Sequence, residues 1–137
     1  MELRSVEELM DLLYACDCGG VGADGQAHAL RTAALLRRGR PADKELQVAG
    51  LVRPVGRLLG PGDPAERAAD AVRALLGERV AGLVRRRPSA GADDDALALR
   101  SAEEEARTAC FDPGVLEDWR TVLELLAARA SRLDAPG

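Results

Sequence analysis

The segment from Leu46 to Val52 constrains the fold of this chain more than any other stretch. Its apolar residues lie on most sides of a helix, which predicts a central, buried helix rather than one with a single apolar face. Pro54 follows shortly afterwards, and proline lacks a backbone N–H and disfavours helical geometry at the preceding residue, Arg53. The helix should therefore end or bend at Arg53.

The composition favours an all-α protein. Apolar residues make up 47% of the 137 residues and aromatic residues only 2%, so the core has to be built from leucine, valine and alanine, which suits closely packed helices. A chain of this length fits one domain, residues 1–137, with a single core. We predict a compact bundle of about six or seven helices.

Helix start and stop signals predict where these helices lie. A capping box at Ser5–Glu8 begins a first helix that runs to about Ala15, and a second helix spans about Gly25 to Arg38. Pro64 and Gly77 bound a further helix, because proline is favoured at a helix start and glycine after a helix end. Later helices are expected over about 78–86, from the acidic run at 93–95, from a second capping box at Ser101–Glu104, and along a final apolar stripe comprising Val115, Trp119, Val122, Leu126, Ala130 and Leu133.

Charge and apolar patterning argue against several classes of function. The formal net charge is -4, whereas nucleic-acid binding needs a basic face that displaces counterions from phosphates. No apolar run approaches the about 18 residues that span a bilayer, and the N-terminus lacks the apolar segment of a signal peptide. The three cysteines fit free thiols in a reducing compartment. We therefore expect a cytoplasmic protein with no nucleic-acid or membrane partner.

Three segments carry a resemblance to a known family. They are residues 27–33 (AHALRTA), 48–59 (VAGLVRPVGRLL) and 69–84 (ADAVRALLGERVAGLV), and a weaker match resumes at 101–105 and 111–113. Together they resemble the HD-domain proteins, in particular the small members associated with phosphonate breakdown, which include mixed-valence di-iron oxygenases. The resemblance implies a compact, HD-domain-like helical bundle.

The same resemblance indicates that most of the family's metal ligands are missing. In the family, the metals are held by a histidine on the second helix, a His-Asp doublet, two further histidines and a late aspartate. Only the first is kept, as His28. The other positions fall on Arg53 with Pro54, near Asp63 or Pro64, near Arg87 and near Leu126. Metal coordination needs several ligands that converge at about 2 Å, so we expect neither a metal nor another cofactor.

His28, the only histidine, is the candidate catalytic residue. An unperturbed imidazole titrates near neutral pH and transfers protons without a metal. The alternative is that His28 is a hydrogen-bonded part of the helical core.

Three arginines are the candidate substrate-binding residues. If the HD scaffold is kept, Arg53, Arg57 and Arg87 stand where metal ligands faced the cavity, and a guanidinium group there is able to grip a carboxylate or phosphate with two hydrogen bonds. The alternative places Arg53 and Arg57 in solvent after the break at Pro54, and makes Arg87 part of a solvated helix end.

These features lead to competing hypotheses of function. The first is a metal-independent protein that binds an anionic small molecule or peptide in the former metal cavity. It promotes an acid–base intramolecular addition or cyclisation in natural-product biosynthesis, with His28 moving the proton; the lysinoalanine-forming proteins of lanthipeptide biosynthesis are similar in size and helical character. The second is a non-catalytic interaction protein whose last helix pairs with another copy in a homodimer or with another partner. A third is residual metal-dependent phosphohydrolase or oxygenase activity.

Overall fold

The computed structural model of the chain describes residues 3–18, 25–59, 62–85, 94–108 and 114–134, without the side chains of residues 16–18, 25–27, 57–58, 96 and 131–134. Within these ranges it contains α-helices and 3-10 helices but no strand, which confirms the all-α prediction. The elements are α1 (Val6–Cys18), α2 (Gly25–Gly39), α3 (Lys44–Val52), η1 (Arg53–Leu58), α4 (Pro64–Leu76), α5 (Glu78–Arg85), α6 (Asp94–Thr108), η2 (Leu116–Trp119) and α7 (Arg120–Asp134).

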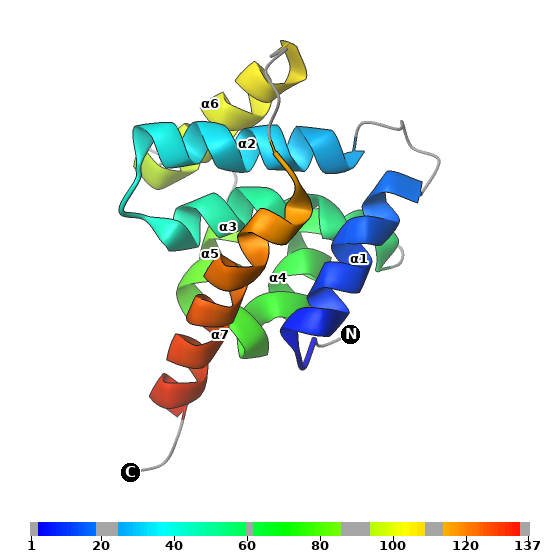
Figure 1. The fold of residues 1–137 in the computed structure, drawn as a ribbon, viewed down its shortest axis with the longest axis vertical. Coiled ribbons are helices and arrows are strands. Elements are labelled where there is room, and N and C mark those ends of the chain that lie inside the picture. The colour runs from blue at the N-terminus through cyan, green and yellow to red at the C-terminus, as the bar shows by residue number, and fades with distance from the viewer. Residues whose placement is uncertain (1–2, 19–24, 60–61, 86–93, 109–113, 135–137) are drawn as a thin grey trace.

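Helix α3 lies at the centre of the bundle (Figure 1). It packs against α2, α5, α6, α7 and η1, and every residue from Leu46 to Val52 is buried. Helix α2 lies alongside it, and α6 passes behind α2 and extends to the edge of the molecule (Figure 1). The sequence prediction of a central, buried helix is confirmed.

Local polar contacts explain why so short a helix forms at α3. Asp43 is its N-cap, and the carboxylate accepts a hydrogen bond of 3.1 Å from the backbone N–H of Leu46. The buried side chain of Gln47 donates to the carbonyl oxygen of Arg40 at 2.7 Å and to that of Pro41 at 3.3 Å. The only polar side chain in the buried part of α3 is therefore hydrogen-bonded and secures the turn before it.

The end of α3 follows from the position of Pro54. The backbone N–H of Arg53 still bonds to the carbonyl of Ala49, and the chain then continues as the 3-10 helix η1. Helix η1 approaches α4 so closely that a Cβ on Gly56 would lie 1.8 Å from the carbonyl oxygen of Pro64. Glycine at position 56 is therefore needed for this contact.

The buried apolar residues form one cluster to which all seven α-helices contribute within the described ranges. Leucine, valine and alanine make up most of it. The largest buried side chain is Trp119, which is 1% exposed and has the guanidinium carbon of Arg37 4.9 Å from its ring centroid. None of the described helices is long and apolar enough to cross a membrane.

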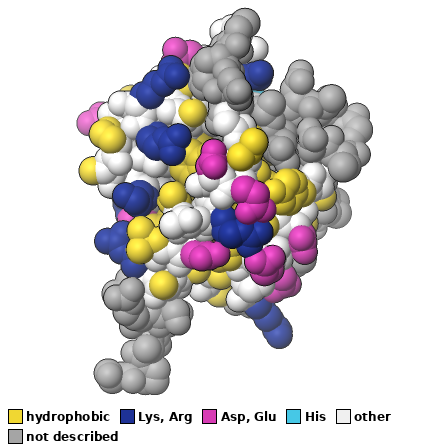
Figure 2. Space-filling model, in the orientation of Figure 1, with side chains coloured by type: hydrophobic (Ala, Val, Ile, Leu, Met, Phe, Trp, Pro, Cys, Tyr) yellow, Lys and Arg dark blue, Asp and Glu magenta, His cyan; other side chains and the backbone are white. Residues whose placement is uncertain are grey.

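The surface over α1 and the start of α7 carries charges of both signs. Arg120 bonds to Glu117 at 2.9 Å and also pairs with Glu7 of α1, while the hydroxyl of Tyr14 donates to Glu117 at 3.0 Å. Figure 2 shows acidic side chains gathered around basic ones on this face. These contacts link α1 to η2 and α7 across the surface.

The prediction of a helix start at Ser101 is wrong. Ser101 lies inside α6, which begins at Asp94. Asp94 and Asp95 occupy its first turn, where acidic side chains interact favourably with the helix dipole. Glu104, the residue expected to complete the cap, instead pairs with Arg100 at 3.0 Å on the exposed side of α6.

The predicted apolar stripe of the last helix is partly wrong as well. Val115 precedes η2 and is 60% exposed, because the 3-10 turn changes the helical register before α7 begins. The residues that enter the core are Leu116, Trp119, Leu123, Leu126 and Ala130.

Replacing Gly56 by alanine should lower the free energy of unfolding by about 2–3 kcal/mol, because the added methyl group meets backbone that cannot rotate away. Gly82→Ala is the matched control, since a Cβ there meets no atom within 4 Å and alanine is favoured over glycine within α5. Urea denaturation of both variants measures the difference. Equal stability of the two variants would contradict the close contact between η1 and α4.

Candidate functional site at the junction of α2, α3 and α6

The side chain of His28 reaches from α2 to α6. Its Nε2 lies 3.1 Å from the backbone carbonyl oxygen of Glu103, and the contact is partly buried. A carbonyl oxygen only accepts hydrogen bonds, so Nε2 carries the hydrogen. In the neutral imidazole, Nδ1 is then the nitrogen that carries the lone pair.

Arg53 reaches the same residue from the end of α3. Its Nη1 donates to the carboxylate Oε1 of Glu103 at 2.6 Å, a short, charge-assisted hydrogen bond. The side chains of Arg53 and Glu103 are 19% and 25% exposed, respectively. The pair is therefore shielded from much of the solvent without being sealed inside the core.

The absence of a side chain at Gly50 allows α3 to pack closely against α2 and α6. A Cβ on Gly50 of α3 would lie 2.7 Å from Leu36 Cδ1 and 3.0 Å from Thr32 Cγ2, both of α2, and 3.4 Å from Leu99 Cδ1 of α6. The hydroxyl of Thr32 is turned back onto its own helix and donates to the carbonyl of His28 at 2.9 Å. Glycine on α3 thus allows both α2 and α6 to pack closely against α3.

The structure places two of the four predicted site residues in one cluster. His28 and Arg53 are joined through Glu103. Arg57 belongs to η1, but its side chain lies outside the described residues. Arg87 also lies outside them.

Glu103 is the residue that the sequence reasoning missed. The sequence predicts a helix start at Ser101–Glu104, whereas Glu103 lies on the inner side of α6 between buried Leu99 and Ala106. The spacing of these apolar residues, read as one long helix, was the available signal. Arg31 was also missed: it follows His28 by one helical turn, and its Nε is buried without a hydrogen-bond partner among the described residues.

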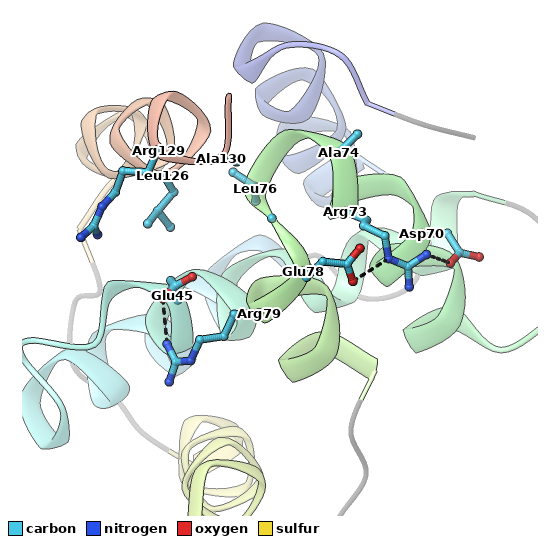
Figure 3. Close-up of a pocket in the computed structure, with 11 residues that line it drawn as sticks. Glu45, Asp70, Arg73, Ala74, Leu76, Glu78, Arg79, Leu126, Arg129 and Ala130 are labelled. Carbon is cyan, nitrogen blue, oxygen red and sulfur yellow. Dashed lines mark hydrogen bonds and ion pairs between the residues drawn. The ribbon is translucent and has the colours of Figure 1, made fainter. Parts of the chain in front are cut away.

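A cavity of about 750 Å³ lies elsewhere, between the α4–α5 turn and α7 (Figure 3). Its lining includes neither His28 nor Arg53. Its charged side chains are Arg73, Arg79, Arg129, Glu45, Asp70 and Glu78. Because acids and bases are equal in number in this lining, the cavity carries no net charge that would attract an anion.

Arg79, on the edge of this cavity, joins the beginnings of two helices. Its two terminal nitrogens donate to the two carboxylate oxygens of Asp43 at 2.7 and 2.9 Å, and one also reaches Glu45 at 3.0 Å. Asp95, in the first turn of α6, lies 3.5 Å from Arg79 and pairs with Arg40 at 2.8 Å. The hydrogen bonds from Arg79 hold the pKa of Asp43 below its ordinary value, and the N–H of Leu46 adds to the effect.

Among the described residues, no three His, Cys, Asp or Glu side chains are grouped so that they could hold a metal ion. Comparisons with protein-family models, with curated proteins and with solved structures gave no match to this chain. The geometry of the His28–Glu103–Arg53 cluster is therefore the basis for a functional proposal.

Arg79→Gln should destabilise the fold by about 1 kcal/mol or less at neutral pH, because Arg79 is partly exposed and solvent weakens its ion pairs. A lowered pKa of Asp43 means stability that is present above the ordinary carboxyl pKa and is lost as the pH falls through the lower, folded-state value. The difference between wild type and variant should therefore shrink below about pH 4.

Denaturant unfolding across pH 2–7 measures this dependence. Arg85→Gln on the same helix is the control, since the ion pairs that Arg85 makes with other described residues are longer, at 3.4 and 3.7 Å. A difference between wild type and Arg79→Gln that grows as the pH falls would contradict the assignment.

Proposed function

We propose that this chain is a metal-independent protein of HD-like ancestry that binds an anionic small molecule or peptide at the junction of α2, α3 and α6. In this proposal, His28 transfers a proton within the bound ligand. The observation that supports it is the convergence of His28 and Arg53, predicted from sequence as one site, on the single residue Glu103. A base and a fixed positive charge thus lie on either side of the same partly exposed residue.

Each residue has a defined role in the proposed chemistry. Arg53 supplies a permanent positive charge that orients an anionic group of the ligand, because guanidinium stays protonated at physiological pH. His28 Nδ1 removes a proton from a nucleophile as it adds to an acceptor carbon in the same molecule, and the imidazolium returns a proton to the adjacent carbon. Nothing is consumed, so substrate and product are isomers.

An intramolecular addition of this kind fits natural-product biosynthesis, with formation of a lysinoalanine bridge in a lanthipeptide as one candidate. The support is the resemblance in size and helical character to lysinoalanine-forming proteins, together with a histidine base that needs no metal. A homodimer in the cytoplasm is part of the same proposal.

A non-catalytic interaction protein is the second candidate. An interaction protein is favoured because His28 and Arg53 both contact α6 of the same chain. These contacts hold α6 against the rest of the helical bundle. Leu125 of α7 is 41% exposed and offers apolar surface for a partner. This candidate predicts that His28 matters for stability alone.

Two substitutions of His28 separate the candidates. In His28→Gln, the amide nitrogen is able to keep the hydrogen bond to the Glu103 carbonyl, but the side chain transfers no protons; His28→Ala loses both properties. The proposal predicts that His28→Gln folds like wild type yet slows the reaction about 10²–10⁴-fold, the usual contribution of a general acid–base group. Under the second candidate, His28→Gln functions normally and only His28→Ala is impaired.

The measurement is mass spectrometry of extracts from a native host whose gene is deleted and replaced by wild type or a variant. We expect two compounds of identical mass and different retention time, with the precursor accumulating in the deletion strain and in the His28→Gln strain. Thermal unfolding followed by circular dichroism shows which variants are folded. The absence of any isomer pair that distinguishes wild type from the deletion strain would contradict the proposed reaction.

A further inference from the structure

We infer that Glu103 occupies the place of a ligand carboxylate on Arg53, so that the anionic group this site accepts is a carboxylate that displaces Glu103. This inference rests on the proposed function and specifies its substrate class. It makes Glu103 a built-in competitor whose side chain has to leave Arg53 before the ligand binds. In the structure, the Glu103 carboxylate then binds Arg53 in the way that the ligand carboxylate would bind it.

The geometry of the pair supports exchange with an external carboxylate. The 2.6 Å hydrogen bond uses Nη1 of Arg53, and guanidinium has further N–H groups arranged to bind a carboxylate through two parallel bonds. With 25% of its side chain exposed, Glu103 is able to rotate into solvent. An incoming carboxylate reaches an arginine that is already held in position by the end of α3.

The backbone of Glu103 does not need to move in this exchange. Its carbonyl oxygen is held by His28 Nε2, so α6 keeps one of its attachments to α2 when the carboxylate departs. Leu99, Ala102 and Ala106 of α6 also remain buried. The displacement is therefore a rotation of one side chain rather than the release of a helix.

Charge balance favours a carboxylate over a phosphate. Replacing one monoanionic carboxylate by another leaves the charge of this partly buried site unchanged. A phosphate group carries about -1.5 to -2 charges at neutral pH, so a phosphate on Arg53 would place additional negative charge in a shielded position, where desolvation is costly. By competing for Arg53, Glu103 lowers the affinity of the site for a ligand carboxylate. Because Glu103 is itself a monoanion, its exchange also favours a carboxylate over a phosphate.

The test is binding of sodium acetate, followed by the side-chain Nε–H resonance of Arg53 in ¹H–¹⁵N NMR spectra of the full chain. The resonance is assigned by its absence in Arg53→Lys. In Glu103→Gln, which removes the competing charge, acetate should bind about tenfold more tightly than in wild type, because a hydrogen bond to a charged group contributes about that factor. Glu104→Gln is the matched control: it changes the net charge equally, but Glu104 pairs with Arg100 on the exposed side of α6.

Inorganic phosphate, titrated at constant ionic strength, is the second arm. The inference predicts that Glu103→Gln binds acetate more tightly than phosphate. It is overturned if Glu103→Gln and Glu104→Gln bind acetate equally, or if phosphate binds Glu103→Gln more tightly than acetate. Thermal unfolding of each variant confirms that the comparison is between folded proteins.

The acetate titration tests the carboxylate subsite, and the isomer experiment tests the chemistry of His28, so either result can contradict its own claim independently of the other. Tighter acetate binding with no isomer pair in extracts supports the carboxylate subsite and contradicts the chemistry assigned to His28. An isomer pair that depends on His28, combined with unchanged acetate binding in Glu103→Gln, supports the chemistry and contradicts the role of Glu103.

Discussion

Helix α3 is buried along nearly its whole length and exposes no face to solvent, and much of this fold depends on that property. Each neighbour of α3 has to present an apolar or small surface, which explains a core of leucine, valine and alanine with a close approach at Gly50. Buried Gln47 meets the constraint because backbone carbonyls before the helix accept its hydrogen bonds. The helix ends at Pro54, and this break sets where Arg53 lies.

The position of Arg53 connects the fold to the candidate site. At the end of α3, the arginine side chain reaches α6, where Glu103 also accepts the hydrogen bond of His28 from α2. One acidic residue thus joins three helices through its carboxylate and its carbonyl. The same contacts allow two interpretations. Either they only stabilise the packing of α6 on the bundle, or they position the base His28 and the cation Arg53 beside the displaceable carboxylate of Glu103. The distinction is chemical, because only the second requires His28 Nδ1 to accept a proton.

Much of the architecture could be predicted from local signals. Pro64 and Gly77 bound α4 as expected, because proline at a helix start and glycine after a helix end act through their own backbone geometry. The burial of α3 followed from its apolar pattern. The register of the last helix could not be predicted in this way, since a 3-10 turn at Leu116–Trp119 exchanges Val115 for Leu116 in the core. A local pattern does not reveal that change.

The candidate site could be predicted only in part. The resemblance of the sequence to a metal-binding scaffold predicts that His28 and Arg53 lie at one site, and both contact Glu103 in the structure. Glu103 was missed because a serine followed by glutamates has the same pattern at a helix start as in a helix interior, and only the longer course of α6 separates the two. The partner of a charged side chain distant in sequence is set by packing, which no local motif contains.

Both interpretations of the site depend on the contact between Arg53 and Glu103, and a double-mutant cycle on the free energy of unfolding measures the strength of this contact. Urea denaturation of Arg53→Gln, Glu103→Gln and the double variant gives the coupling between the two side chains. A 2.6 Å hydrogen bond between partly buried charges predicts a coupling of about 1 kcal/mol. Additive effects, with a coupling below about 0.3 kcal/mol, would contradict the contact and the site built on it.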